Sequence, residues 1–325
     1  MLPCRAETAF SRLEESRIEP TGAMHLNGVA RGVRFRRDQA APGMLVTWNF
    51  DWRVRLERMG KQKTTIRHSI QGNPVGPTLV FIHGWPDDDT LWRMQVSALG
   101  DDYRCFLLTL PNFGDDHEKI GGFDFPELVE RLAATIREVH PGGPVGLVIH
   151  DWGAHLGYLL EQKYPELVDR MAALDIGAHM YPLPLKARLI IVGYQWALVL
   201  SWWAGGVLPP LGNLLTRGVA NVVGVPERQR AAIRSRYNYL YFYLWRATLL
   251  PRHRYKMLTR YKPRCPLMFL YGKRKPLMFH SPRWLEIVAA SGGWSEGVEG
   301  AGHWLMESHA ETVNASLARW FSAAE

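Results

Sequence analysis

The stretch Val148-Ile149-His150-Asp151-Trp152-Gly153-Ala154 decides the fold, because it joins a short apolar run to a run with helical spacing. A sharp turn from a strand to a helix holds its central side chain out of the sheet, above backbone N–H groups at the helix N-terminus. A carboxylate in that position can attack carbon and form an ester. The alternative is a plain helix N-cap, the commonest role of an aspartate before a helix.

Two other segments favour the chemical interpretation over the N-cap. Thr78 to Pro86 is a buried-strand run that ends in His83-Gly84-Trp85-Pro86. Far downstream, Gly300-Ala301-Gly302-His303-Trp304 places a histidine in a loop before the amphipathic stretch Ala310 to Phe321. The three motifs, in this chain order, are much more specific together than any one of them alone.

On these motifs, the chain resembles the α/β-hydrolase superfamily, on the branch that contains epoxide hydrolases and haloalkane dehalogenases. The resemblance covers about residues 64 to 325 and implies an eight-stranded, mostly parallel sheet with helices on both faces and a helical cap inserted after strand six. The residue pattern agrees, because apolar runs alternate with helix-period segments, as parallel strands with crossovers require. These runs are Thr78–His83, Tyr103–Leu110, Val145–His150, Met171–Asp175 and Pro266–Tyr271.

We therefore expect three regions: a basic, partly ordered N-terminal extension over residues 1–63, an α/β core over 64–176 and 263–325, and a helical cap over 177–262. The first residues lack the apolar core of a secretory signal, and early acids disfavour a transit peptide. The expected location is cytoplasmic, with peripheral attachment to a membrane as the alternative.

The composition is typical of a folded protein and contains no pattern that indicates a cofactor. Hydrophobic residues make up 47% and aromatic residues 11%, enough for a sizeable core. The three cysteines (Cys4, Cys105, Cys265) give neither a disulfide framework nor a metal-ligand spacing. There is no Gly-rich phosphate loop, so we expect no cofactor and no metal.

Charge is divided unevenly along the chain. Residues 176–285 hold 18 Lys/Arg and one acid, Glu227, whereas the presumed core is net acidic. A cationic cap favours anionic partners such as phospholipid headgroups. No recognised motif supports nucleic acid binding, and none is expected.

The segment Leu189 to Thr216 has no charged residue over 28 positions and is long enough to span a bilayer. Gly and Pro residues interrupt it, and it falls where the family inserts its cap. A cap helix that lines an apolar pocket is the preferred interpretation. Docking of this face onto an anionic membrane is the alternative.

The resemblance implies a role for each motif residue. Asp151 would be the nucleophile and His303 the base that activates water. The acid that orients the histidine commonly follows strand seven, but Lys275 stands there in this chain. Some family members carry the acid after strand six, where this chain has Asp175. We expect the Asp175 carboxylate on a ring nitrogen of His303, with Lys275 pointing elsewhere or toward solvent; Asp175 as a turn residue is the alternative.

Backbone amides of Trp85 and Trp152 would form the oxyanion hole, and His83 and His150 would brace the two turns. Epoxide hydrolases use two cap tyrosines to protonate the opened epoxide. Tyr194, followed by Gln195, resembles the first. For the second we expect Tyr243, with Tyr241 in reserve and Trp245 close enough to occupy that place.

The implied activity is the opening of small apolar epoxides to diols. A haloalkane dehalogenase is the near alternative, since it shares the nucleophile, base and ester; there the indole N–H groups of Trp152 and a second tryptophan, such as Trp196, would hold the halide. A catalytically silent, membrane-associated protein on the same fold is the third alternative, suggested by Lys275 and the basic cap.

Overall fold

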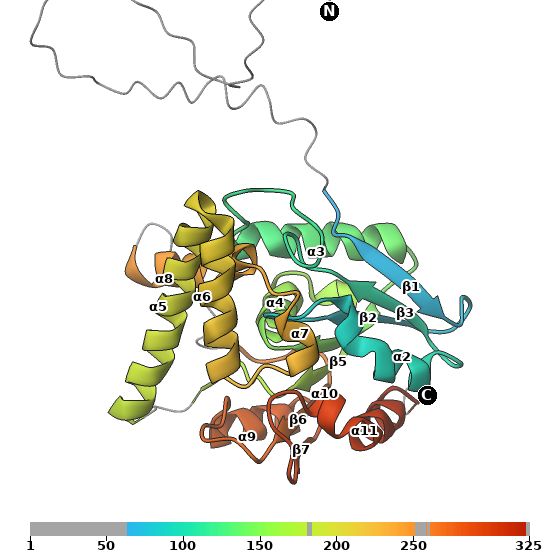
Figure 1. Cartoon of the computed structure of the whole chain (residues 1–325). Coiled ribbons are helices and arrows are strands. Elements are labelled where there is room, and N and C mark those ends of the chain that lie inside the picture. The colour runs from blue at the N-terminus through green and yellow to red at the C-terminus, as the bar shows by residue number, and fades with distance from the viewer. Residues whose placement is uncertain (1–63, 181–183, 251–257, 259–260, 323–325) are drawn as a thin grey trace, which may run out of the picture. The chain divides into compact units, whose positions relative to one another are not determined.

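The computed structural model describes residues 64–180, 184–250, 258 and 261–322. Its centre is a seven-stranded sheet in the order β1-β3-β2-β4-β5-β6-β7 (Figure 1). β1 is antiparallel to β3, and all other neighbours are parallel. The strands are β1 (His68–Gly72), β2 (Thr78–Ile82), β3 (Arg104–Leu108), β4 (Val145–His150), β5 (Val168–Leu174), β6 (Leu267–Gly272) and β7 (Ser295–Val298).

The α/β architecture is confirmed, and the five apolar runs are β2, β3, β4, β5 and β6, within a few residues at each end. The described residues form seven strands of the eight-stranded sheet that was expected for the whole chain. The expected N-terminal extension, residues 1–63, lies outside the described residues.

Helices cover both faces of the sheet (Figure 1). Those of the core are α2 (Arg93–Leu99), α3 (Phe125–Val139), α4 (Trp152–Lys163), α9 (Pro282–Ala290), α10 (Leu305–Ser308) and α11 (Ala310–Ser322), with 3-10 turns η1 (Asp89–Trp92) and η2 (Pro165–Leu167). Successive side chains of a strand point to opposite faces. In β2, Leu79 and Phe81 pack in a cluster with residues of α2 and α11, while Val80 and Ile82 pack with residues of α3 and α4.

The inserted helices lie between β5 and β6, and we call them the cap. They are α5 (Leu185–Val207), α6 (Pro209–Val222), α7 (Glu227–Arg230), η3 (Ser235–Asn238) and α8 (Tyr239–Leu249). The long uncharged segment is thus two helices, because Pro209 begins α6 directly after Leu208. α5 and α6 approach closely: a Cβ on Gly212 would meet the Cα of Gly205 at 2.3 Å.

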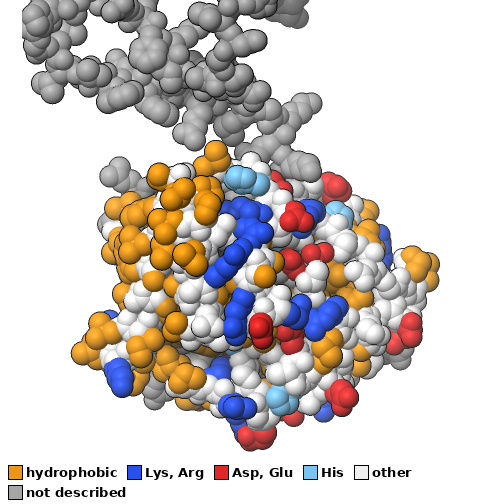
Figure 2. Space-filling model, in the orientation of Figure 1, with side chains coloured by type: hydrophobic (Ala, Val, Ile, Leu, Met, Phe, Trp, Pro, Cys, Tyr) orange, Lys and Arg blue, Asp and Glu red, His pale blue; other side chains and the backbone are white. Residues whose placement is uncertain are grey.

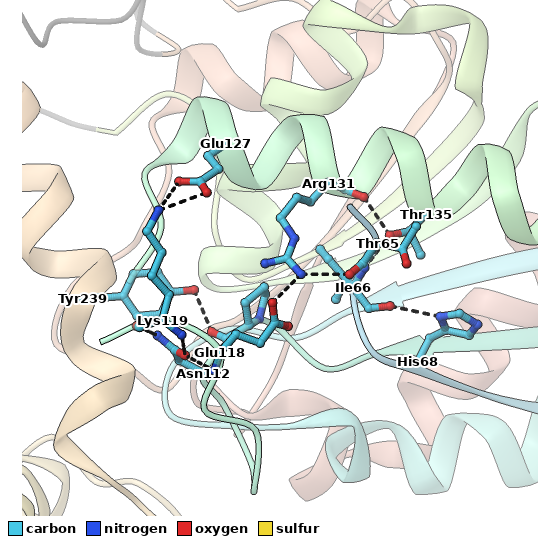
Figure 3. Close-up of polar contacts among 11 residues, drawn as sticks. Thr65, Ile66, His68, Asn112, Glu118, Lys119, Glu127, Arg131, Thr135 and Tyr239 are labelled. Atoms are coloured by element: carbon cyan, nitrogen blue, oxygen red, sulfur yellow. Dashed lines mark hydrogen bonds and ion pairs between the residues drawn. The ribbon is translucent and has the colours of Figure 1, made fainter. Parts of the chain in front are cut away.

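A cross-braced loop after β3 supports the cap. The Asn112 side chain accepts the amides of Glu118 and Lys119 and donates to the Lys119 carbonyl (Figure 3). The buried Arg131 of α3 holds the Glu118 carboxylate at 2.6 Å. On this loop the Tyr239 hydroxyl donates to the Pro111 carbonyl at 3.0 Å. These bonds hold the loop at both its ends. The start of α8 therefore packs, through Tyr239, on a well-braced part of the core.

Candidate active site

The carboxyl ends of four parallel strands lie side by side at one edge of the sheet. Ile82 of β2 is level with Ile149 of β4, and Leu174 of β5 is level with both His150 and Leu270. The turns that follow these strands therefore meet, and they carry the residues that the motifs predicted. In open α/β sheets this edge is the usual position of a ligand site.

Asp151 occupies the turn between β4 and α4 in a strained backbone conformation, with φ 53° and ψ −121°. A non-glycine residue with positive φ costs free energy and marks a position that the surrounding structure enforces. Asp151 precedes α4, and its side chain bonds the Trp152 amide at the first position of that helix but makes no N-cap hydrogen bond to the amides that follow. The plain N-cap interpretation is therefore wrong.

Two turn amides face the Asp151 carboxylate. The Trp85 N–H donates to Oδ1 at 2.7 Å. Burial raises the pKa of Asp151, but hydrogen bonding and charge attraction from His303, with a bond from the Trp152 amide, outweigh it and hold the pKa below its ordinary value. Gly84 is required here, because a Cβ would lie 2.3 Å from Oδ1. The carboxylate is thus ionised, and the Trp85 and Trp152 amides both bond it.

His303 lies in the loop between β7 and α10 and joins two carboxylates. Its Nδ1 is 2.6 Å from Asp175 Oδ2, and its Nε2 is 3.6 Å from Asp151 Oδ2. Burial lowers the His303 pKa, but the hydrogen bonds to Asp151 and Asp175 outweigh it and raise the pKa to about 9. The structure thus brings Asp151, His303 and Asp175 together as the sequence predicted.

Asp175 is fully buried directly after β5, in the left-handed region with φ 70°. Its Oδ1 accepts the Gly272 amide at 3.1 Å. The same Oδ1 also accepts a hydrogen bond from the Lys275 ammonium, and the Lys275 side chain is almost fully buried. The expectation that Lys275 would point elsewhere or toward solvent was wrong. Burial raises the Asp175 pKa, and the bonds to His303 and Lys275 reverse this and lower it.

Two other histidines hold the turns. His83 Nε2 accepts the Leu110 amide at 3.0 Å, so Nδ1 carries the proton that is shared with the Gly84 carbonyl at 2.8 Å. His150 Nε2 donates to the His303 carbonyl at 3.2 Å. Burial and the nearby His303 charge lower the His150 pKa to about 3. Both are neutral and act as braces between loops.

In the cap, the structure reverses the preference between the two candidate tyrosines. The Tyr243 hydroxyl donates to the Gly121 carbonyl at 3.1 Å, away from Asp151. Tyr241 is buried with its ring against Trp85 and Trp152, at centroid distances of 5.8 and 5.2 Å. The expectation that Tyr243 lies at the site was therefore wrong. Tyr241, the second candidate, lies there instead.

Tyr194 of α5 shares this space, with its ring 6.2 Å from that of Tyr241. Burial raises its pKa to about 12, repulsion from the Asp151 charge adds to this, and a hydrogen bond with the Gln195 side chain partly offsets it. Burial raises the Tyr241 pKa well above its ordinary value, offset in part by a bond from the Trp152 side chain. Both hydroxyls are therefore protonated near a carboxylate.

The other aromatic candidates pack elsewhere. Trp196 and Trp245 face each other at a centroid distance of 5.3 Å and contribute to the apolar packing of the cap. The Trp85 indole N–H donates to Asn238 Oδ1 at 2.8 Å. Neither a Trp196 nor a Trp245 contact with Asp151 is found among the described residues.

Two residues at the site escaped the sequence reasoning. Asp87, just beyond His83-Gly84-Trp85-Pro86, is buried and accepts the Trp304 indole N–H at 3.0 Å. Burial raises its pKa to about 7, partly offset by that bond and reinforced by Asp151. Asn238 also donates to the Leu198 carbonyl and to Thr216 Oγ1. Asp87 could have been found, because it is an acidic residue directly after a motif. Nothing in the sequence distinguishes Asn238, a single asparagine in the cap, as a site residue.

Comparison with known proteins agrees with this architecture. A family model described as alpha/beta hydrolase fold matches residues 77–224. The solved structure of epoxide hydrolase A from Mycobacterium thermoresistibile superposes with a TM-score of 0.61 at 21% identity, over 80% of this chain and 96% of that one. The M1 loop variant of haloalkane dehalogenase DbeA from Bradyrhizobium elkanii superposes with a TM-score of 0.59 at 17% identity, over 78% of this chain and 92% of that one. The chain has the α/β-hydrolase fold.

The relatives in sequence include an epoxide hydrolase and an oxetanone decarboxylase. Epoxide hydrolase 1 of Caenorhabditis elegans is 27% identical over 152 residues, 45% of this chain and 35% of that protein. A cis-3-alkyl-4-alkyloxetan-2-one decarboxylase of Xanthomonas campestris pv. campestris is 28% identical over 175 residues, 51% and 56% respectively. These matches thus span between about a third and just over a half of the relatives' own lengths. The chain has the α/β-hydrolase fold and is similar in sequence, at low identity, to epoxide hydrolases.

Proposed function

We propose that this protein hydrolyses epoxides to diols through an alkyl ester on Asp151. The observation that carries the proposal is the Asp151 carboxylate itself: Oδ1 accepts the Trp85 amide, and Oδ2 lies toward His303, which is in turn bonded to Asp175. This leaves Oδ2 as the attacking atom and gives the second step both a base and an oxyanion site.

In the first step, Oδ2 attacks an epoxide carbon and the carbon–oxygen bond of the ring breaks. Tyr194 or Tyr241 gives its hydroxyl proton to the oxygen that leaves the carbon, and the result is a hydroxyalkyl ester. Two phenols with pKa values above the ordinary one are protonated at neutral pH, as a general acid must be.

In the second step, His303 removes a proton from water, whose oxygen attacks the Asp151 carbonyl carbon. The developing charge on Oδ1 is held by the Trp85 and Trp152 amides. The ester bond then breaks, the leaving alkoxide takes the proton from His303, and the diol departs. The second water proton passes to the tyrosine that acted as the acid, so protons balance over the cycle.

The His303 pKa suits this order of events. A pKa of about 9 keeps His303 protonated beside the Asp151 carboxylate in the free protein. Ester formation removes the Asp151 charge, and with it one of the interactions that raise the pKa. His303 then loses its proton to solvent and becomes a base when the ester is present and water must be activated.

An epoxide is favoured over a haloalkane because the indole donors near Asp151 are engaged. Trp85 donates to Asn238, and the Trp152 side chain bonds to Tyr241. A halide needs two free N–H donors, whereas an epoxide oxygen needs the hydroxyls that Tyr194 and Tyr241 carry. The haloalkane reaction, the silent fold and ring opening of an oxetanone are the outcomes that the test must separate.

The test uses the full chain and two variants, with His303→Gln designed to form the ester but not to hydrolyse it. After exposure to an epoxide panel, its intact mass should rise by the whole mass of one epoxide, at Asp151. A bromoalkane would add only its alkyl group and release bromide. Asp151→Asn should form no adduct and no diol while it keeps the native circular dichroism spectrum.

Outcomes that contradict the proposal are specific. Halide release with no diol from any epoxide would assign the dehalogenase reaction instead, and loss of CO₂ from a dialkyl oxetanone alone would assign the decarboxylase reaction. Absence of any adduct on His303→Gln across all three substrate classes would favour the silent fold.

A further inference from the structure

The outer face of the cap is apolar over its whole length. On α5, seven large hydrophobic side chains are exposed, from Val192 at 37% to Val207 at 89%. At 100° per residue, six of them fall within an arc of about 80° on one side of the helix, and the seventh, Ile190, lies about 80° beyond one edge of this arc. The six are Leu185, Leu189, Val192, Leu200, Trp203 and Val207.

The stripe continues onto the neighbouring helix. On α6, exposed hydrophobic side chains again share one side, within an arc of about 100°: Leu211, Leu214, Leu215 and Val222. Leu208 lies exposed between the two helices, and Leu249 is exposed at the end of α8. Figure 2 shows the resulting patch of hydrophobic side chains over the cap, where acidic side chains are sparse.

The patch is not the buried side of a core helix. α5 is the one helix of the described residues that is long and apolar enough to cross a membrane, and only 17% of its most apolar window is buried. Its opposite side already packs inward, where Leu198 and Val199 are buried. Contiguous exposed apolar surface of this extent marks an interaction site.

Basic residues border the patch. The only charged residues of α5 are Lys186 and Arg188, both exposed at its first turn, and the helical angles place one on each side of the 80° arc, with Lys186 between the arc and Ile190. Over residues 184–250 the cap has eight Lys/Arg and a single acid, Glu227. Arg228 and Arg246 pair with the core acids Glu307 and Asp124. Arg217 and Arg234 instead bond backbone carbonyls of the cap, which carry no charge.

We infer that this face docks onto an anionic phospholipid surface, with α5 and α6 lying in the plane of the membrane interface. Apolar side chains on one side and basic residues at the margins are the pattern of helices that bind there. A second copy of the chain fits less well, because pairing this face with itself would bring cation against cation without acids between them. The inference rests on the surface alone and stands apart from the proposed activity.

The test is sedimentation of the full-length protein with vesicles of phosphatidylcholine alone and of phosphatidylcholine mixed with phosphatidylserine. The expected result is binding to the mixed vesicles that weakens as salt is raised. The triple change Leu200→Ser, Trp203→Gln, Val207→Ser should lower the partition coefficient at least tenfold, since it removes most of the buried apolar area at one end of the stripe.

The charge pair Lys186→Gln, Arg188→Gln should lower binding to the anionic vesicles by roughly tenfold or more, and should leave the weaker binding to phosphatidylcholine unchanged. The matched control is Val75→Ser with Ile120→Ser, two apolar side chains that are exposed outside the cap. It should bind as the unaltered protein does.

Three results would overturn the inference. The first is no binding to either vesicle. The second is binding that survives the triple change, which would assign the contact to another part of the chain. The third is a dimer in light scattering that the triple change dissociates, which would make the face an interface between copies.

Discussion

At the scale of single residues, the unexpected feature is the cation beside Asp175, the proposed catalytic acid. Lys275 stands where related enzymes commonly have the acid itself, and its ammonium bonds Asp175 Oδ1 while His303 bonds Oδ2. The acid and the lysine together leave less net negative charge near the imidazole than the acid alone. We therefore expect Lys275 to position Asp175 and to keep the His303 pKa lower than Asp175 alone would.

Lys275→Met should raise the pKa that governs hydrolysis of the ester by about one unit, because removing the cation stabilises protonated His303. The hydrolysis rate rises with pH as His303 loses its proton, so the profile should move to higher pH and the rate at neutral pH should fall. Single-turnover decay of the alkyl ester across pH measures this directly.

The control is Lys273→Met, two residues away, where the ammonium pairs with the exposed Glu299 at 2.5 Å. It should leave the profile in place. If Lys275→Met lowers the free energy of unfolding but the profile does not shift, Lys275 has only a structural role.

The three triad residues could be predicted because each follows a recognisable strand or sits in a glycine-rich loop, and the chemistry needs that residue type there. The Lys275 contact could not be predicted from its position alone. β5 and β6 are neighbours, so the ends of the two strands are close, but a lysine side chain can reach the adjacent turn or extend into solvent with the same backbone. Only packing decides between the two.

At the scale of elements, α8 explains why the wrong tyrosine was preferred. Residues two apart on a helix point roughly 200° away from each other. Tyr241 therefore faces Asp151 when Tyr243 faces the loop at Gly121. The segment from Tyr237 to Trp245 is aromatic on all sides, so no apolar periodicity identifies its inner face.

Tyr241→Phe and Tyr194→Phe should each slow formation of the Asp151 ester, and the double change should slow it by roughly 10²–10⁴-fold, the usual contribution of a general acid. Ester hydrolysis should change less, because it depends on His303. Tyr243→Phe is the matched control on the same helix, and stopped-flow measurement of ester formation should find it close to the unaltered rate. A larger effect of Tyr243→Phe than of Tyr241→Phe would reverse this assignment.

Elements of the core were predictable to within a few residues because buried parallel strands are short apolar runs between turns. The uncharged segment Leu189 to Thr216 was harder, since length and composition fit a membrane span, a buried helix and a helical hairpin equally. The structure resolves it as a hairpin with one side exposed. That exposure, which no composition encodes, is the observation on which the inferred membrane docking rests.

At the scale of the whole molecule, the cap and the core are coupled through the active site itself. Asn238 accepts the Trp85 indole N–H and donates to Leu198 of α5 and to Thr216 of α6. The backbone amide of the same Trp85 donates to the Asp151 carboxylate. A single buried side chain thus links the position of two cap helices to the geometry of the oxyanion site.

Asn238→Leu keeps the volume but leaves the buried Trp85 indole N–H without its acceptor, so it should lower the free energy of unfolding by about 1–3 kcal/mol. It should also slow ester formation by roughly tenfold or more, because a small displacement of Trp85 shifts the amide that holds Asp151. Denaturant unfolding and single-turnover kinetics measure the two effects. Asn221→Ala, which removes an exposed contact with Arg230, should change stability by no more than about 0.5 kcal/mol and leave the rate as it is. A stability loss for Asn238→Leu with an unaltered rate would mean that the cap is only seated on the core, whereas loss of both together is what coupling through Trp85 requires.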